Sequence, residues 1–529
     1  MTCTSETSGL VPWSAQLRGQ ALRWGDALAV DDTRGQTLTH AQLSQRAHAW
    51  AQHLVSAGVQ PGVPIATLLP NGLSAVWASL GLRLHGACEV TLGWVYTDGE
   101  LLWAKTLSGV QRVLTTPDQR ERMQALGFEV WCDDAVTAAD HGQVMPPIPA
   151  SIRSRIMFTS GTTGKPKAVV YDHGRRWLGE LQQLAHWDFK PGPGDAVLLM
   201  TPYIHGSGLL ASAWMSQGGL AVVAQGADGP RVLPWLTGQR NQPGQRLRAV
   251  FAPPTVLAKL HQELDRSGAA AVAPVEVIFT GTQPLTPGLH ALTQGRWGDV
   301  IRITYGKTEC INPITVLPPH AVAEGLAEGQ RLGGACVGWP ALGVEIRLGP
   351  PDGQISEARP EQEVWLRAAH MSNGLIDAQG WRDHECQGWH ATGDLGAWDD
   401  QGRLHLVGRM ADVMKTGGYK VNPDEIEATL SGMPECPVVA ITSVPSEYWG
   451  EVLVVVAEQP MPAWVEAVKA RVASLSSHKR PRLFVALNAF DRNAQGKVSR
   501  RRLREQVLAA HTFTDGPHPA LAPWAGSTP

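Results

Sequence analysis

The 529-residue sequence is poor in several features that would assign a protein to a special class. Its seven cysteines are scattered, odd in number and never spaced as Cys-x-x-Cys, which indicates reduced thiols rather than a disulfide framework or a zinc site. No run of 18 apolar residues occurs, so no transmembrane helix is expected. The first 20 residues lack the basic and apolar regions of a secretory signal, and we therefore expect a cytoplasmic protein.

An excess of charge of one sign is also missing. Lys and Arg total 45 and Asp and Glu total 48, so the net charge is −3 and gives no electrostatic reason for nucleic acid or an anionic membrane as partner. Hydrophobic residues at 43% and charged residues at 18% are ordinary for a globular protein. The length predicts two to four domains.

Glycine, proline and tryptophan are abundant instead. The 56 Gly and 38 Pro have no collagen-like period and indicate many loops and tight turns. Trp occurs 20 times, against 6 Tyr and 8 Phe, an excess that the sequence alone does not explain.

Strands and helices alternate through the first 300 residues. Residues 38–58 have helical apolar spacing, 63–71 predict a short buried strand, and 74–87 predict another helix. The same alternation recurs at 109–131, 196–225 and 248–303. Such a pattern predicts an α/β fold with a largely parallel sheet covered by helices on both faces.

The pattern changes in the last 200 residues. Short Gly-rich strands over 333–408 predict antiparallel hairpins in a small barrel-like subdomain. A helix over 423–431, a strand–helix–strand region over 437–487 and a basic helix over 499–509 predict a compact unit of ordinary domain size. The Pro- and Gly-rich stretch 511–529 is expected to be a flexible tail.

The strongest local motif lies in the segment IMFTSGTTGKPKAVVY, residues 156–171. Glycines let the backbone turn its N–H groups toward an anion, and hydroxyls and lysines add donors, so the segment predicts a polyphosphate-binding loop. It is not a Walker A motif, because Pro166 stands five residues after Gly161. The alternative is a polar surface hairpin between two strands. The binding residues expected here are Thr159, Ser160, Gly161, Thr162, Thr163, Gly164, Lys165 and Lys167.

The stretch TSGTTGKPK closely resembles the signature loop of the acyl-adenylate-forming (AMP-binding) enzymes, which include acyl-CoA synthetases, and further family motifs follow in order. The resemblance implies a large N-terminal domain, 1–408, of mixed, largely parallel sheets with helices on both faces and a β-barrel-like subdomain. It also implies a small mobile α+β lid domain, 409–510. The implied reaction uses ATP and Mg²⁺ to convert a small carboxylic acid to acyl-AMP, and then transfers the acyl group to a thiol, most simply that of coenzyme A.

A second motif, TYGKTE, follows the loop by about 140 residues. By resemblance, Tyr305 and Gly306 line the adenine and acyl pocket and Thr308 contacts the α-phosphate. Glu309 would help to hold Mg²⁺, for which a carboxylate is a suitable ligand, together with Thr163 of the loop.

Two looser matches lie between these motifs. FTGTQPL resembles the family's adenine-binding turn, in which Gly281, Thr282 and Gln283 would contact the base. TPYIHGSG resembles the segment that opens the acid pocket, which would place His205 at the substrate carboxylate as a catalytic contact. No aspartate stands there to pair an α-ammonium group, which argues against an amino acid substrate.

The longest match covers 390–421. Asp394 resembles the carboxylate that binds both ribose hydroxyls, and Arg409 the arginine that reaches the ribose or phosphate. The family's hinge residue falls on Ala411, a departure from the usual acidic residue or lysine that puts its polar contact in doubt. The residues expected to line the thiol tunnel are Lys415, Gly417, Gly418 and Lys420.

The motif RNAQGKVSRRRLRE resembles the terminal motif whose lysine carries the adenylation step, which assigns that role to Lys497. Four neighbouring arginines are expected to form only a solvated cationic face, namely Arg500, Arg501, Arg502 and Arg504.

The motifs do not specify which carboxylic acid is the substrate. We expect Lys307 to extend into solvent; the alternative is an inward lysine that pairs with a second anionic group of a dicarboxylate. The acceptor can also be a carrier-protein thiol or an amine, and a non-catalytic nucleotide-binding regulator is the alternative from another class. Expected walls of the acid pocket are Tyr203, His205, Phe251, Thr280, Cys310 and Ile311.

Overall fold

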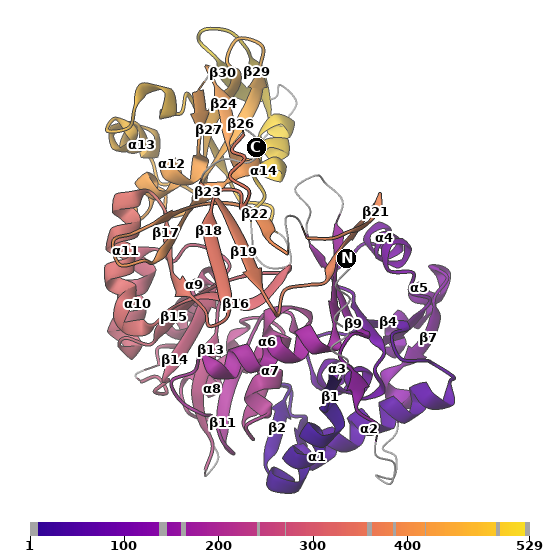
Figure 1. Cartoon of the computed structure of the whole chain (residues 1–529). Coiled ribbons are helices and arrows are strands. Elements are labelled where there is room, and N and C mark those ends of the chain that lie inside the picture. Colours follow the sequence, from indigo (N-terminus) through magenta and orange to yellow (C-terminus); the bar gives the residue numbers. More distant parts are fainter. Residues whose placement is uncertain are drawn as a thin grey trace.

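A computed structural model describes residues 9–136, 145–159, 166–240, 244–269, 271–356, 362–384, 388–417, 419–492 and 498–523. Figure 1 shows an α/β molecule in which two large sheets fill the body and a small sheet lies at the C-terminal end. The predicted fold class is therefore confirmed, whereas the exact division at 408/409 stays a prediction.

One large sheet has eight strands, and its centre is parallel. β9 is parallel to β5 but antiparallel to β10, and β10, β20 and β21 are antiparallel to their neighbours. The strand order is β21 (Gly380–Arg382), β20 (Gly374–Asp377), β10 (Lys167–Asp172), β9 (Arg153–Thr159), β5 (Cys88–Thr91), β4 (Pro64–Leu68), β6 (Arg112–Thr115) and β7 (Glu129–Cys132).

The second large sheet has thirteen strands, parallel from β2 to β15 and antiparallel beyond. Its order is β18 (Val344–Leu348), β19 (Glu363–Ala368), β22 (His390–Trp398), β23 (Leu404–Arg409), β17 (Ala335–Pro340), β16 (Cys310–Leu317), β15 (Ile301–Lys307), β14 (Val277–Gly281), β13 (Arg246–Phe251), β11 (Asp195–Leu199), β12 (Leu220–Val223), β2 (Leu28–Asp31) and β3 (Thr37–Thr39). The antiparallel strands expected over 333–408 are present, but they extend this sheet, and β20 and β21 extend the other one.

Helices connect the parallel strands, as the apolar periodicity predicts. The helix predicted over 38–58 is α2, which begins with a capping box formed by Thr39 and Gln42. The helices of the body are α1 (Trp13–Trp24), α2 (His40–Ser56), α3 (Leu73–His85), α4 (Asp98–Ser108), α5 (Arg120–Ala125), α6 (His173–Ala185), α7 (Gly208–Met215), α8 (Gly229–Leu236), α9 (Pro254–Ser267), α10 (Pro287–Trp297) and α11 (Pro319–Leu332).

The largest core cluster joins the two big sheets. It contains apolar side chains from β4 of one sheet, from β11 to β14 of the other, and from α2, α3 and α7. Trp50 and Trp214 are among its fully buried members, and Trp235 and Trp365 are buried in other parts of the core. Part of the tryptophan excess therefore supplies core volume, since each indole buries a large apolar area.

The C-terminal part is built on a five-stranded sheet, and its helix α12 lies against β23 of the body (Figure 1). Within 437–487, two strands rather than the one predicted precede helix α13. Its elements are β24 (Met414–Thr416), β25 (Tyr419–Val421), α12 (Pro423–Leu430), β26 (Val439–Ser446), β27 (Gly450–Glu458), α13 (Trp464–Val472), β28 (Leu483–Leu487) and α14 (Arg500–Ala510).

The flexible tail expected over 511–529 is wrong for its described part. Residues 511–523 form a hairpin of β29 (His511–Thr514) and β30 (Ala520–Pro523). Phe513 and Leu521 pack against the apolar cluster around Val454, and Trp449 Nε1 donates a hydrogen bond to the carbonyl of Gly516 at 3.0 Å. Apolar packing thus outweighs the local preference of the Pro- and Gly-rich sequence.

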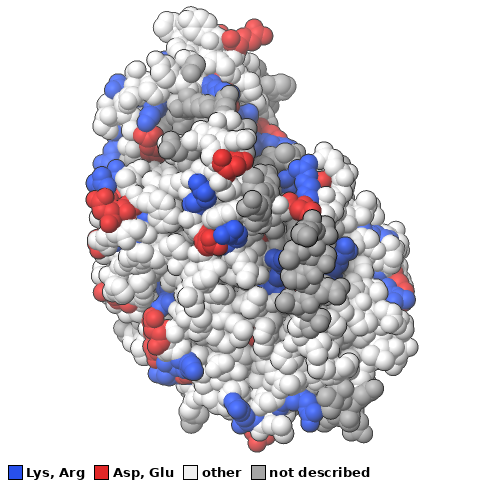
Figure 2. Space-filling view, viewed as in Figure 1, with Lys and Arg blue, Asp and Glu red and all other residues white. Residues whose placement is uncertain are grey.

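The surface carries charges of both signs. On the face that Figure 2 shows, Lys and Arg side chains are interspersed with Asp and Glu, in keeping with the net charge of −3. Among the helices of the described ranges, none is both long and apolar enough to cross a bilayer.

Deletion of residues 511–529 tests the docked hairpin. Because Phe513 and Leu521 lose their packing, we expect stability to fall by about 1–3 kcal/mol. Thermal unfolding measures the change, and a control that lacks only residues 524–529 should keep the wild-type midpoint. Equal midpoints for the two truncations would contradict the docking.

Candidate active site

The phosphate-loop segment is the connection of a β-hairpin. Thr159 at the end of β9 pairs with Lys167 at the start of β10. The indole of Trp103 donates a hydrogen bond to the carbonyl of Pro166 at 2.8 Å, which ties one end of the connection to α4. The loop residues Ser160, Gly161, Thr162, Thr163, Gly164 and Lys165 lie outside the described residues, so their roles stay predictions.

The predicted adenine turn follows the carboxyl end of β14. A side chain at Gly281 would lie 2.3 Å from the carbonyl oxygen of Thr304 on the adjacent strand, so only glycine fits there. Thr282 has a φ of 67° and Gln283 continues the turn. The buried hydroxyl of Thr280 has no hydrogen-bond partner among the described residues. A tight turn with an unpaired hydroxyl fits a polar ligand at this edge of the sheet.

The carboxylate of Asp394 is held by hydrogen bonds and ion pairs from three side chains. Its Oδ2 accepts hydrogen bonds from the hydroxyl of Tyr305 and from Nζ of Lys307, the latter at 3.2 Å, and its Oδ1 lies 3.0 Å from Nε of Arg409. Only 3% of Asp394 is exposed. Burial raises the pKa of this carboxyl, but the charges of Lys307 and Arg409 and the two hydrogen bonds bring the pKa below its ordinary value. Asp394 is therefore ionised at neutral pH.

Strand pairing explains why these groups meet. Asp394 on β22 is directly opposite Arg409 on β23. Its backbone N–H is held by the hydroxyl of Thr392, and Gly393 before it takes a left-handed φ of 70°. The register of β22 and β23 therefore places the carboxylate of Asp394 next to the guanidinium of Arg409.

Lys307 differs from both sequence-based alternatives. Its side chain is only 14% exposed, and Nζ donates to the carbonyl of Thr392 at 2.7 Å as well as to Asp394. The expectation of a solvent-exposed lysine is wrong, and the lysine is not directed at the acid pocket either. A hydrogen-bonded ion pair at the expected ribose carboxylate compensates the loss of hydration.

Thr308 and Glu309 form the turn between β15 and β16. The carbonyl of Thr308 accepts a hydrogen bond from the hydroxyl of Tyr171 on β10 at 2.7 Å, and the carbonyl of Glu309 accepts one from the N–H of Ser372 at 2.8 Å. Gly306 before the turn has no room for a side chain, since a Cβ would lie 2.9 Å from Asn312. The turn is thereby attached to the strand that follows the phosphate loop.

Among the described residues, Glu309 offers the expected magnesium site a single carboxylate. Within the described ranges no group of three or more His, Cys, Asp and Glu side chains is arranged to hold a metal ion. A single carboxylate fits Mg²⁺ that enters as the ATP complex, because that ion keeps water and phosphate oxygens as its other ligands.

His205 lies in one irregular turn, the π-helical segment Tyr203–Ser207, where it has φ −109° and ψ −148°. The turn is anchored on both sides of the histidine. The N–H of Tyr203 donates to Oδ1 of Asn71 at 2.8 Å, and Nη2 of Arg155 donates to the carbonyl of Ile204 at 2.8 Å. Arg155 belongs to β9, so this contact connects the strand that enters the phosphate loop with the turn that bears His205.

Arg155 is part of a buried charge cluster that the sequence motifs did not indicate. Glu89 pairs with Arg176 at 2.7 Å and lies 3.8 Å from Arg155, while Glu180 pairs with Arg83 at 2.9 Å. Burial raises the pKa of Glu89, but the charges of Arg155 and Arg176 lower this pKa to about 2. The only sequence signal for the cluster is charged residues inside otherwise apolar strands and helices.

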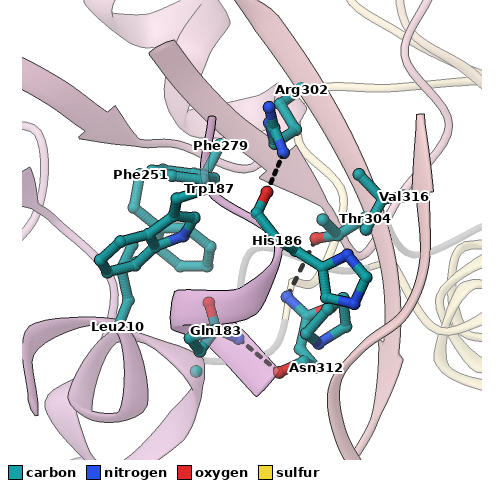
Figure 3. Close-up of a pocket in the computed structure, with 12 residues that line it drawn as sticks. Gln183, His186, Trp187, Leu210, Phe251, Phe279, Arg302, Thr304, Asn312 and Val316 are labelled. Carbon is teal, nitrogen blue, oxygen red and sulfur yellow. Dashed lines mark hydrogen bonds between the residues drawn. The ribbon is translucent and has the colours of Figure 1, made fainter. Parts of the chain in front are cut away.

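The pocket beside the turn is lined by only one of the expected wall residues, Phe251. Tyr203 is instead buried in the core, Cys310 lies 3.7 Å from His370, and Ile311 packs against Gly179. Tyr203, Thr280, Cys310 and Ile311 do not line this pocket, whereas Gly206, the neighbour of His205, does. Their assignment as walls of the acid pocket stays a prediction. The observed lining (Figure 3) is Gln183, His186, Trp187, Gly206, Leu210, Phe251, Phe279, Arg302, Thr304, Asn312, Pro313 and Val316.

The predicted tunnel segment is a hairpin in which Lys415 on β24 pairs with Lys420 on β25. Gly417 has a left-handed φ of 56°, and its N–H donates to the carbonyl of Trp449 at 2.8 Å. Gly418 and Lys497 lie outside the described residues, as does the side chain of Lys420.

The hinge segment is tied to the last helix. Ala411 lies in a short 3₁₀ turn, and its neighbour Asp412 pairs with Arg500 of α14 at 2.6 Å. Arg500 also pairs with Glu427, and Arg504 pairs with Glu451 at 2.9 Å. The expectation of a purely solvated arginine face is thus wrong for these two arginines, because acidic partners come from other segments of the chain.

Comparison with known proteins identifies the family of this chain. The family model of the AMP-binding enzymes matches residues 17–376. The feruloyl-CoA synthase of an Amycolatopsis species is 27% identical over 428 residues, which cover 79% of this chain and 83% of the relative. The 2-succinylbenzoate–CoA ligase of Bacillus subtilis is 26% identical over 485 residues, or 90% of this chain and 94% of the relative.

A solved structure agrees at the level of the fold. The o-succinylbenzoate CoA synthetase of Bacillus subtilis, solved with its acyl-adenylate intermediate, superposes with a TM-score of 0.78 at 24% identity, covering 92% of this chain and 97% of that one. The chain belongs to the AMP-binding enzyme family. The predicted class, an AMP-forming acid–thiol ligase, is confirmed.

Replacement of Lys307 tests the organisation around Asp394. Lys307→Met removes one of two cations that depress the pKa of Asp394, so this pKa rises. As the pH is lowered, Asp394 of the variant becomes protonated at a higher pH than Asp394 of the wild type. We therefore expect the KM for ATP of the variant to start rising at a pH closer to neutrality. Measurement of this KM between pH 5 and 8 checks the shift, with Lys105→Met on α4 as a remote control. Identical profiles for all three proteins would refute the coupling.

Replacement of Arg155 tests the anchor of the His205 turn. Arg155→Met deletes the bond to Ile204 O, and misplacement of the turn is expected to lower kcat/KM for the acid on the order of ten- to hundred-fold. Ser79→Ala is the matched control, because it removes hydrogen bonds to Glu89 and Arg176 in the same cluster without touching the turn. The rate of pyrophosphate release measures kcat/KM. Equal losses of kcat/KM in both variants would show that Arg155 supports the fold without positioning the His205 turn.

Proposed function

We propose that this protein activates a small carboxylic acid as an acyl-AMP with release of pyrophosphate and then transfers the acyl group to coenzyme A. The observation that carries this proposal is the buried, ionised Asp394, which lies with Tyr305, Lys307 and Arg409 close to the Thr308–Glu309 turn. A carboxylate held in this way is suited to accept hydrogen bonds from the two hydroxyls of a ribose.

The first step needs charge stabilisation rather than covalent catalysis. A carboxylate oxygen of the acid attacks the α-phosphorus of MgATP, a P–O bond forms, and the bond to pyrophosphate breaks. The negative charge that moves onto pyrophosphate must be met by fixed positive groups in a site that excludes water. The product is a mixed anhydride in which AMP is a good leaving group.

The chain supplies these groups from separate segments. The loop between β9 and β10, residues 159–167, holds the β- and γ-phosphates, and Thr308 contacts the α-phosphate. Glu309 and Thr163 would hold Mg²⁺, which would neutralise phosphate charge, and Gly281, Thr282 and Gln283 would contact the adenine. Lys497 bridges the acid and the α-phosphate, since a lysine cation acts strongly in a site of low dielectric.

The second step needs a different arrangement. The thiol of coenzyme A loses its proton to solvent, its sulfur attacks the acyl carbon, and AMP departs. Lys497 must leave the site for this step, which is the reason for a lid of residues 409–510 that turns about Ala411. The hairpin with Lys415 and Lys420 then lines the path of the thiol.

The alternatives to this function are a different acyl acceptor and a protein without catalytic activity. A carrier-protein thiol or an amine can attack the same acyl-AMP, and a regulator that binds nucleotide without chemistry would show no turnover. Incubation with ATP and an acid library, with AMP release measured with and without coenzyme A, separates these functions. Acid-dependent pyrophosphate exchange without a response to coenzyme A would favour the other acceptors. The reduced, scattered cysteines support a cytosolic location for the reaction.

Replacement of Lys497 tests the adenylation step. We expect Lys497→Ala to reduce acid-dependent pyrophosphate release by at least about 100-fold, because the charge between the two reactants is lost, while ATP still binds. Lys469→Ala, which removes an exposed lysine paired with Glu466 on α13, should behave as the wild type. Acyl-AMP formation at the wild-type rate in Lys497→Ala would show that another group carries this step.

A further inference from the structure

The C-terminal hairpin of β29 and β30 lies beside the small sheet that contains β24, β26 and β27 (Figure 1). Its turn is joined to the turn between β26 and β27 by the carboxylate of Asp515. The hydroxyl of Ser446 donates a hydrogen bond to Oδ1 of Asp515, and the N–H of Glu447 donates one to Oδ2 at 2.6 Å. The hydrogen bond from Ser446, with those from backbone N–H groups, holds the pKa of Asp515 below its ordinary value. An ionised carboxylate therefore connects the two turns at neutral pH.

Trp449, the last residue of the turn between β26 and β27, is held by three contacts. Its N–H donates to Oγ of Ser446 at 2.9 Å, and its indole Nε1 donates to the carbonyl of Gly516 at 3.0 Å. The guanidinium of Arg482 lies 3.9 Å from the centre of the indole, a distance at which a cation is attracted to the ring. The C-terminal hairpin thus restrains both the backbone and the side chain of Trp449.

The carbonyl of Trp449 in turn holds the hairpin of β24 and β25, which we call the tunnel hairpin because the expected path of the thiol runs along it. This carbonyl accepts a hydrogen bond from the N–H of Gly417 at 2.8 Å, and β24 pairs with β27 beside it. A Cβ at Gly417 would lie 3.3 Å from the indole of Trp449, so the two residues are closely packed. A continuous series of contacts therefore runs from Asp515 through Ser446 and Trp449 to Gly417.

All of these contacts lie within the C-terminal part, between β24 and β30. They move with this part, so they neither resist nor favour its rotation about Ala411. In the proposed function the first step uses Lys497, whereas the second step uses the tunnel hairpin. A displacement of Gly417 would therefore act on the second step, since a misplacement of about 1 Å can lower a rate by about 100-fold.

We propose that Asp515 is a positioning residue for the second step of the reaction. Through Ser446 and Trp449 it holds Gly417 of the tunnel hairpin where the thiol of coenzyme A can reach the acyl-AMP. This inference rests on the proposed function. It gives a role to the C-terminal hairpin, which lies beyond the last adenylation motif, residues 492–505.

Asp515→Ala in the full-length protein tests this role. The variant loses both acceptor oxygens but keeps Phe513 and Leu521, which pack the hairpin against the sheet. With the acid that the wild type adenylates fastest, we would measure pyrophosphate release and, separately, the consumption of enzyme-bound acyl-AMP after addition of coenzyme A. At limiting coenzyme A we expect the rate of acyl-AMP consumption to fall by about tenfold, and pyrophosphate release to stay within about twofold of the wild type.

Further variants test the series of contacts. Ser446→Ala removes the next group in the series and should give the same selective loss. The double variant should lose no more than either single variant, because both changes interrupt one series. Asp515→Asn keeps one acceptor oxygen and should lose less than Asp515→Ala. Val468→Ala is the control: Val468 is buried in a different apolar cluster of the same part, so this change lowers the thermal midpoint but leaves the ratio of the two rates unchanged.

Three outcomes overturn the inference while the proposed function stands. Wild-type rates for both steps in Asp515→Ala, an equal fall of both rates in that variant, or the same selective loss in Val468→Ala would each contradict a positioning role. If the wild type releases pyrophosphate with no acid, or if its acyl-AMP does not react with coenzyme A, the proposed function and the inference fall together.

Discussion

A carboxylate that is removed from water must be compensated by charge and hydrogen bonds, and the organisation of this site follows from that requirement. Asp394 is buried, and Lys307, Arg409 and Tyr305 together keep it ionised. These partners come from β15 and β23, which β16 and β17 separate in the sheet, so the contacts connect strands that do not pair directly. The expected nucleotide site is therefore organised by the same contacts that hold this end of the large sheet.

The same constraint acts between the two large sheets. Glu89 and Glu180 are compensated by three arginines from β9, α3 and α6, and Nη2 of Arg155 also donates a hydrogen bond to the turn of His205. Buried ion pairs of this kind contribute little net stability, but the pairs here connect residues from β5, β9, α3 and α6. The hydrogen bond from Arg155 fixes the position of β9, which leads into the expected phosphate loop, relative to the turn that bears His205.

Much of the fold was readable from local patterns. Apolar periodicity predicted α2, β4 and α3 within a few residues, since each element buries one face and its period shows in the sequence. The tail was misjudged, because its hairpin depends on packing of Phe513 and Leu521 against distant residues. Arg500 was misjudged for the same reason, since its partners Asp412 and Glu427 belong to other segments.

The sequence by itself determined the chemical groups and their order: the expected phosphate loop, the TYGKTE turn, the expected ribose carboxylate and the terminal lysine. Local composition suffices there, because glycines, hydroxyls and carboxylates have the same chemistry in any context. Only the tertiary structure decided that Lys307 compensates Asp394, that Arg155 holds the His205 turn, and that Asp515 holds the turn between β26 and β27. The energy of a buried charge or hydrogen-bonding group depends on which distant residues replace its water, and that choice is made by the packed chain.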